Sequence, residues 1–156
     1  MFKEMRRKDR KLSEDESKKI LSVGEYGVFS SVNSEGYAYG VPVNYVYADG
    51  VIYFHCAREG VKLDNITHND RTSFCVVGKT KIIPEEFSTL YESVILFGRA
   101  SIVMDDEERK SAFMHIVKKY SGEFLEKGNE YIIKDGPKAI IVKIVVEHLS
   151  GKAIKE

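Results

Sequence analysis

The sequence predicts a mainly β protein in which six or so antiparallel strands form a closed or nearly closed barrel with peripheral helices. Short runs rich in β-branched and aromatic residues are separated by the turn signals Glu35-Gly36 and Asp49-Gly50, which are typical of hairpins. Several of these runs are long, and closing long strands into a barrel removes exposed sheet edges. A flat α+β sheet is the alternative.

The length and charge are those expected for one domain over residues 1–156, with residues 1–12 as an N-terminal arm. The 24 Lys and Arg residues balance the 24 Asp and Glu residues. This balance argues against nucleic-acid or membrane-surface binding, because both depend on a positive field. No secretory signal or membrane span is recognisable, and we expect a cytoplasmic protein.

The first helix is expected within residues 12–27. Ser13 is a suitable N-cap, and Glu16 three residues later completes a capping box. Gly24 is a typical C-terminal stop.

Six strands are expected from the runs of β-forming residues. They cover residues 26–32, 37–47, 51–57, 72–78, 91–104 and 138–149. Residues 79–90 are expected to be irregular because Pro84 interrupts them. The strand over residues 91–104 is long enough to bend at Gly98.

Two further helices are expected among these strands. Residues 61–69 form a short helix that begins near Gly60 and turns Leu63 and Ile66 inward. Residues 105–120 form a longer helix with an acidic start and two lysines at its end, which complement the helix dipole.

Motifs for catalysis and metal binding are scarce. The sequence contains no dinucleotide-binding glycine fingerprint, phosphate-binding loop, nucleophile elbow or zinc-protease motif. Cys56 and Cys75 lack zinc or redox spacing and are expected to be free, buried thiols. The histidines are widely separated, so no metal site is predicted; they are His55, His68, His115 and His148.

Two cations lie where the short helix begins. Arg58 precedes Gly60, and Lys62 falls in the first turn, where the helix dipole disfavours positive charge. A bound phosphate would explain them, because a helix N-terminus offers free N–H groups and partial positive charge. From the residues alone, a solvated lysine is the simpler interpretation.

Pro42 and a group of tyrosines mark the second predicted strand and its neighbours. A proline in a strand indicates an edge, a strand start or a bulge, and a bulge could present backbone groups to a planar ligand. Alternate tyrosines make a face that suits either a core or a subunit interface. They are Tyr37, Tyr39, Tyr45, Tyr47 and Tyr53.

The segment FHCAREGVKLDN, residues 54–65, resembles the His-x-Ala-x-x-Gly-x-Lys block of the nitroimidazole-resistance branch of the pyridoxamine 5′-phosphate oxidase-like flavoproteins. YESVILFGRA and the terminal GKA are also similar to that branch, and the similarity extends from about Arg6 to Lys152. The resemblance implies an FMN-binding split barrel that forms a homodimer, with FMN in two clefts between subunits.

The same resemblance implies a set of flavin contacts. Phosphate contacts are implied at the short helix and the loop before it: Ala57, Arg58, Lys62 and Asn65. The isoalloxazine ring would lie along Val41, Pro42, Val43, Asn44 and Tyr45. His55 corresponds to the family's histidine near the flavin, and it is the one candidate catalytic residue. Glu92 and Ser93 would approach from the partner subunit.

The activity implied is FMN-dependent reduction of a small organic acceptor. His55 could supply a proton, or it could hold the phosphate loop through a hydrogen bond. The alternatives are a flavin-binding protein that stores FMN or senses redox state, and a haem-binding split barrel. The chain end HLSGKAIKE lacks the substrate-binding arginine block of the pyridoxamine 5′-phosphate oxidases, which argues against vitamin B6 oxidation.

Overall fold

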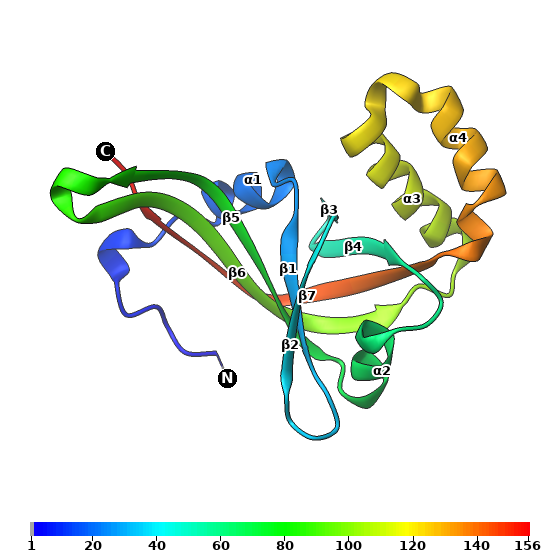
Figure 1. Ribbon diagram of the computed structural model, residues 1–156, viewed down its shortest axis with the longest axis horizontal. Helices are drawn as coiled ribbons and strands as arrows, with labels where there is room; N and C mark the ends of the chain where they lie inside the picture. The colour runs from blue at the N-terminus through cyan, green and yellow to red at the C-terminus, as the bar shows by residue number, and fades with distance from the viewer. Residues whose placement is uncertain (1) are drawn as a thin grey trace.

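The computed structural model describes residues 2–156, and the fold is mainly β with peripheral helices, as predicted (Figure 1). The strands are β1 (Gly27–Val32), β2 (Ala38–Val43), β3 (Val46–Ala48), β4 (Val51–Cys56), β5 (Arg71–Ile83), β6 (Ser88–Ile102) and β7 (Ile140–Ile154). The α-helices are α1 (Glu14–Val23), α2 (Val61–His68), α3 (Asp106–Ser121) and α4 (Leu125–Lys134). Short 3₁₀ turns occupy Lys8–Arg10, Pro84–Glu86, Gly122–Phe124 and Gly136–Lys138.

The chain itself closes the barrel. The antiparallel sheet has the order β2-β1-β5-β6-β7-β4-β3, so β2 and β3 lie at opposite edges. Only Asn44 and Tyr45 separate these strands in the sequence. The two edges must therefore meet, and the sheet forms a split barrel rather than a flat layer. The prediction of one strand over residues 37–47 is wrong, because β2 pairs with β1 whereas β3 pairs with β4.

Helix α1 begins and ends where the sequence predicts. The Ser13 side chain accepts from the Glu16 N–H, and the Glu16 carboxylate accepts from the Ser13 N–H, which confirms the capping box. Gly24 is the C-cap but has an extended conformation, with φ −60° and ψ 135°. The glycine is needed for packing instead, because a Cβ there would lie 2.6 Å from the Tyr45 hydroxyl and from Cγ1 of Val76.

Strands β5 and β6 form a longer hairpin than predicted. Residues 79–90 are not irregular, because Thr80–Ile83 pair with Ser88–Tyr91 on the far side of a register shift. Pro84 sits at the first position of the 3₁₀ turn, where its missing N–H is not needed. A second register shift, between β6 and β7, lies at Phe97 and Gly98, where the sequence predicts a bend. This hairpin extends to the left in Figure 1, away from α2.

Helix α4 is absent from the predicted elements. It packs against α3 to form a helical hairpin at the upper right of Figure 1. Gly128 lowers the helix propensity at the middle of α4. The glycine is required by packing, because a Cβ at Gly128 would lie 2.3 Å from Cγ1 of Val117 in α3.

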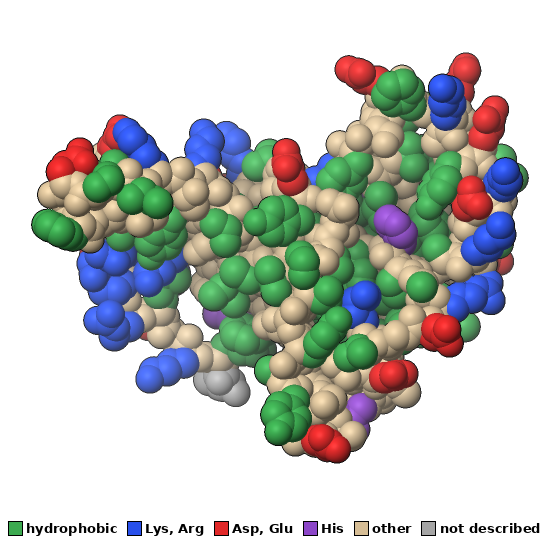
Figure 2. All heavy atoms as spheres, in the orientation of Figure 1, with side chains coloured by type: hydrophobic (Ala, Val, Ile, Leu, Met, Phe, Trp, Pro, Cys, Tyr) green, Lys and Arg blue, Asp and Glu red, His purple; other side chains and the backbone are tan. Residues whose placement is uncertain are grey.

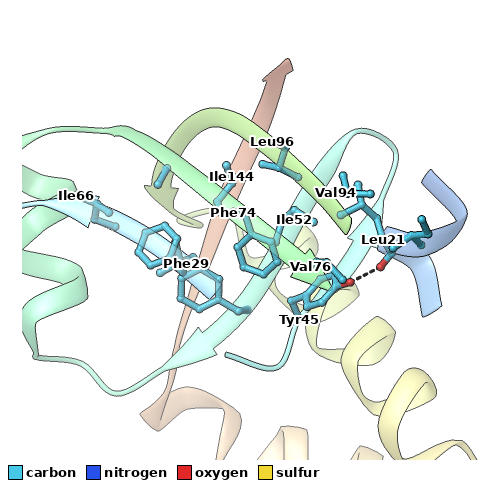
Figure 3. Packing of buried hydrophobic residues seen from close by; sticks show 14 of the residues in the cluster. Leu21, Phe29, Tyr45, Ile52, Ile66, Phe74, Val76, Val94, Leu96 and Ile144 are labelled. Carbon is cyan, nitrogen blue, oxygen red and sulfur yellow. Dashed lines mark hydrogen bonds between the residues drawn. The ribbon is translucent and has the colours of Figure 1, made fainter. Parts of the chain in front are cut away.

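The barrel interior holds the main hydrophobic core (Figure 3). Phe29 and Phe54 pack at 5.0 Å between ring centroids, and the Tyr45 and Phe74 rings meet edge to face at 4.9 Å. All four side chains are fully buried. A second, smaller cluster joins α3 to the outside of the barrel through Phe113 and its neighbours.

Candidate functional site

The connection between β2 and β3 is anchored through Tyr45. Its side chain is buried, its hydroxyl donates to the Leu21 carbonyl at 2.5 Å, and burial raises the pKa of its phenol (Figure 3). Its backbone N–H donates to the Tyr120 hydroxyl at 3.0 Å, and its C=O accepts from Lys119 Nζ at 2.9 Å. Both backbone groups of Tyr45 are therefore engaged within the chain, and Tyr45 positions its neighbours rather than offering a surface to a ligand.

The other residues predicted to lie along the flavin ring divide into two sets. Val41 and Val43 are half-buried and pack against the barrel core. Pro42 and Asn44 are exposed, and Asn44 Nδ2 donates to the Glu25 carbonyl at 2.9 Å. The outward surface of this segment is thus made by Pro42 and Asn44.

His55 shares a groove with Asn44. The groove has a volume of about 430 Å³ and lies between the barrel and the α3–α4 hairpin. The His55 ring keeps an exposed edge, while its centroid lies 6.2 Å from that of Phe113. Burial on that side lowers the pKa of His55 below its ordinary value, because the charged imidazolium loses hydration.

The start of α2 has the features of an anion site. Gly60 is the N-cap, and no side chain caps the helix. Its φ of 143° requires glycine, and open space lies where a Cβ would point. Lys62 is half-buried in the first turn, and its ammonium opposes the rise that burial causes in the pKa of the Cys56 thiol. An open, uncapped helix start with a neighbouring ammonium fits a phosphate.

Two predicted phosphate residues have other partners. Asn65 is buried, and its Nδ2 donates to Ser31 Oγ at 3.0 Å, which ties α2 to β1. The Arg58 guanidinium donates to the Pro137 carbonyl and so joins the loop before α2 to the segment before β7. Ala57 is exposed in the loop before α2.

Glu92 and Ser93 lie on β6, within the part of the sheet that leads into the long hairpin. The Glu92 carboxylate accepts from the Lys79 N–H at 3.1 Å. Within residues 2–156, no side-chain hydrogen bond or salt bridge joins either residue to α2. Their predicted approach from a partner subunit stays a prediction.

Several residues of the groove are missing from the predicted site. They belong to the α3–α4 hairpin and are Ile116, Val117, Tyr120, Ser121, Phe124, Lys127, Gly128 and Tyr131. The one signal available in the sequence is the pair Tyr120 and Phe124, two aromatic residues four positions apart. Their proximity to Asn44 and His55 arises only when the hairpin folds onto the barrel.

Lys119 supports a prediction about pH. Burial lowers the pKa of Lys119 to about 8, although the 3.9 Å contact of Nζ with the Tyr45 ring centroid partly offsets this effect. The folded protein therefore binds this proton less tightly than the unfolded chain. Stability contributed by Lys119 should rise with pH between about 8 and 10.5.

We expect the Lys119→Met variant to lack this rise. Urea midpoints of both proteins at about pH 7 and pH 10 measure it, and the informative quantity is the difference between the two pH responses. Burial raises the thiol pKa values of Cys56 and Cys75, and both thiols titrate in both proteins. Their contributions to the two pH responses therefore cancel in the difference. Parallel pH responses would contradict the prediction.

In the part of the chain that the structure describes, no group of His, Cys, Asp or Glu could hold a metal ion, and no helix is long and apolar enough to cross a membrane. The closed sheet defines a split barrel, with an uncapped, cationic helix start at α2. The family described as pyridoxamine 5′-phosphate oxidase matches residues 13–153. The chain therefore belongs to this family of flavin-binding split barrels.

Solved structures share the fold at low sequence identity. A conserved hypothetical protein from Mycobacterium tuberculosis is 19% identical, with a TM-score of 0.81 over 96% of this chain and 90% of that chain. A candidate 5-nitroimidazole antibiotic resistance protein from Bacteroides thetaiotaomicron is 19% identical, with a TM-score of 0.74 over 92% and 86%. An FAD- and haem-binding protein from Mycobacterium smegmatis is 14% identical, with a TM-score of 0.75 over 92% and 72%. No curated protein matches the sequence significantly.

Proposed function

We propose that this protein binds FMN and passes electrons from it to a small organic acceptor. The observation that carries the proposal is the start of α2. This helix has no side-chain cap, open space lies beside its N-cap Gly60, and Lys62 is in its first turn. The chain is also a member of a flavin-binding family. One such site supports a cofactor with one phosphate, FMN, rather than the diphosphate of FAD.

In this proposal, FMN and the residues around it have separate roles. FMN supplies the two-electron chemistry when bound. Lys62 balances the phosphate charge, and Pro42 and Asn44 offer the outward surface along which the ring lies. His55 holds a proton near the acceptor, and its lowered pKa keeps most imidazoles neutral at about pH 7. Proton donation by His55 therefore strengthens as the pH falls.

Extraction of the chromophore from purified protein tests the cofactor. Chromatography should recover FMN, and recovered FAD or haem would overturn this part of the proposal. Turnover of a nitroaromatic compound with a reduced nicotinamide then separates an enzyme from a protein that only stores FMN or senses redox state. Free thiols at Cys56 and Cys75 support a reducing compartment, and we propose the cytoplasm.

We also propose that one folded domain spans the chain and forms a homodimer through the outer face of the sheet. Hydrophobic side chains gather over the middle of this face, and charged ones lie mainly around it (Figure 2). Strand register aligns two outward rows of uncharged residues, Pro42-Val28-Cys75-Ile95 and Gly40-Ser30-Ser73-Phe97. An uncharged face of this kind is typical of a subunit interface.

The Ile95→Glu variant is expected to dissociate this homodimer, because a carboxylate would lose its hydration at the interface. Ile95 is 44% exposed in the single chain, so the monomer itself should stay folded. Light scattering measures the mass, and Ile133→Glu on the exposed side of α4 is the control. A wild-type monomer of 17.7 kDa that binds FMN tightly would refute the dimer.

A further inference from the structure

The groove under the α3–α4 hairpin extends beyond the predicted flavin contacts. The barrel contributes Asn44 and His55, and the hairpin contributes the rest of the lining. Figure 2 shows hydrophobic side chains between the hairpin and the strands. The hairpin side chains are not among the flavin contacts proposed above, although Tyr120 holds the backbone of Tyr45.

The walls of the groove are aromatic and incompletely packed. Tyr120, Phe124 and Tyr131 line it and remain 38%, 57% and 47% exposed. Ile116 and Val117 make the apolar back of the groove and are almost fully buried. Aromatic faces set around a shared hollow favour stacking with a flat ring.

The charge that lines the groove is positive. Lys127 is the charged residue in the lining, and no Asp or Glu of the described chain lines it. Its Nζ lies 5.9 Å from the Phe124 ring centroid, so the cation stands beside an aromatic wall. Asn44 and a largely neutral His55 offer hydrogen bonds from the barrel side. The groove therefore suits a ligand that is both aromatic and negatively charged.

The hairpin is held in place, so the groove is preformed. Gly128 lets α4 approach Val117 of α3 closely. The Arg109 guanidinium donates to the Gly136 and Ala139 carbonyls and packs over the Phe113 ring at 5.1 Å. These contacts tie both ends of the hairpin to the start of β7. A preformed groove avoids the ordering cost of binding.

The volume limits the ligand. About 430 Å³ is within the range of small-molecule sites and exceeds the roughly 150 Å³ that holds one benzene ring. One substituted ring or two fused rings would fit, whereas a folded peptide would not.

We propose that this groove binds a planar aromatic anion of the aryl carboxylate class, with its ring between Tyr120, Phe124 and Tyr131 and its carboxylate toward Lys127. The inference rests on the proposed function in one respect: a nitro substituent on the same ring would be the electron acceptor beside His55. It would take two electrons from reduced FMN and two protons, lose one oxygen as water and become a nitroso group. The contacts with the ring and the contact with the carboxylate can be tested separately, through Tyr131→Ala and Lys127→Met.

Calorimetric titration of flavin-loaded protein tests the site without turnover. The probes are 4-nitrobenzoate, neutral nitrobenzene and non-aromatic cyclohexanecarboxylate. Wild type should bind 4-nitrobenzoate most tightly. Tyr131→Ala should lower the affinity for 4-nitrobenzoate and the affinity for nitrobenzene alike, by about tenfold. Lys127→Met should lower the affinity for 4-nitrobenzoate by about threefold to fivefold and leave the affinity for nitrobenzene unchanged.

Two variants on the same helix are controls. Ile133 is 78% exposed and Lys134 is exposed, and neither lines the groove, so Ile133→Ala and Lys134→Met should bind all probes as wild type does. Equal affinity for the two nitro compounds in wild type would overturn the anion assignment. Unchanged binding in Tyr131→Ala would overturn the site. Flavin lost from Tyr131→Ala, with probe affinity intact, would assign the groove to the cofactor instead.

These outcomes are distinct from failure of the proposed function. Normal binding of 4-nitrobenzoate with no reduction by flavin-loaded protein would remove the oxidoreductase activity and keep the aryl carboxylate site.

Discussion

The Lys62→Ala variant is expected to bind FMN about one to two decades more weakly while the empty protein stays folded. Without an anion, a lysine in the first turn of α2 is mildly unfavourable, and alanine is the better helix former. With phosphate bound, the lysine forms a charge-assisted contact of roughly 1.5–3 kcal/mol. Fluorescence titration with FMN measures the loss, which should shrink as salt screens the contact.

Two controls separate a phosphate contact from damage to the site. Riboflavin lacks the phosphate and should bind Lys62→Ala and wild type equally. The Lys110→Ala variant removes an exposed lysine from α3 and should leave FMN affinity unchanged. Equal FMN affinities for Lys62→Ala and wild type would make Lys62 a solvated surface lysine. Equal losses for FMN and riboflavin would show a distorted cleft.

The Phe74→Ala variant is expected to lose about 3–5 kcal/mol of unfolding free energy, which is the usual cost of removing a buried aromatic ring. Phe74 is fully buried and packs edge to face against Tyr45. Its ring also fills the space beside Gly27, where a Cβ would lie 2.1 Å from its Cε1. The cavity would therefore open next to the residue that anchors the β2–β3 connection.

The Phe87→Ala variant is the matched control, since Phe87 is 98% exposed. Its unfolding free energy should stay within about 0.5 kcal/mol of wild type. Urea denaturation followed by circular dichroism measures both variants. Similar losses in the two would mean that Phe74 does not support the core as described.

The α2 start and its cations could be found from the sequence, because an N-terminus and its charges are local features. The precise contacts could not. Asn65 is adjacent to the helix start in sequence, but its amide meets Ser31 of β1, which depends on how α2 packs on the barrel. Tyr45 likewise falls within the predicted ring-binding segment, yet its side chain is buried in the barrel.

What the sequence by itself determined is local. The capping box of α1, the extent of α3 and the existence of strands each follow from hydrogen bonds and periodicities within a few residues. The family resemblance follows from a block of neighbouring residues at the start of α2, where we propose the phosphate site.

Only the tertiary structure decided where the strand over residues 37–47 divides, because each half takes its pairing partner from a distant part of the chain. The same is true of α4, whose central Gly128 is explained by Val117 across the hairpin. The groove also depends on the tertiary structure, because Asn44, His55 and Tyr131 come from distant parts of the sequence. Long-range contacts of this kind leave no short-range pattern, and here they decide the shape of the site.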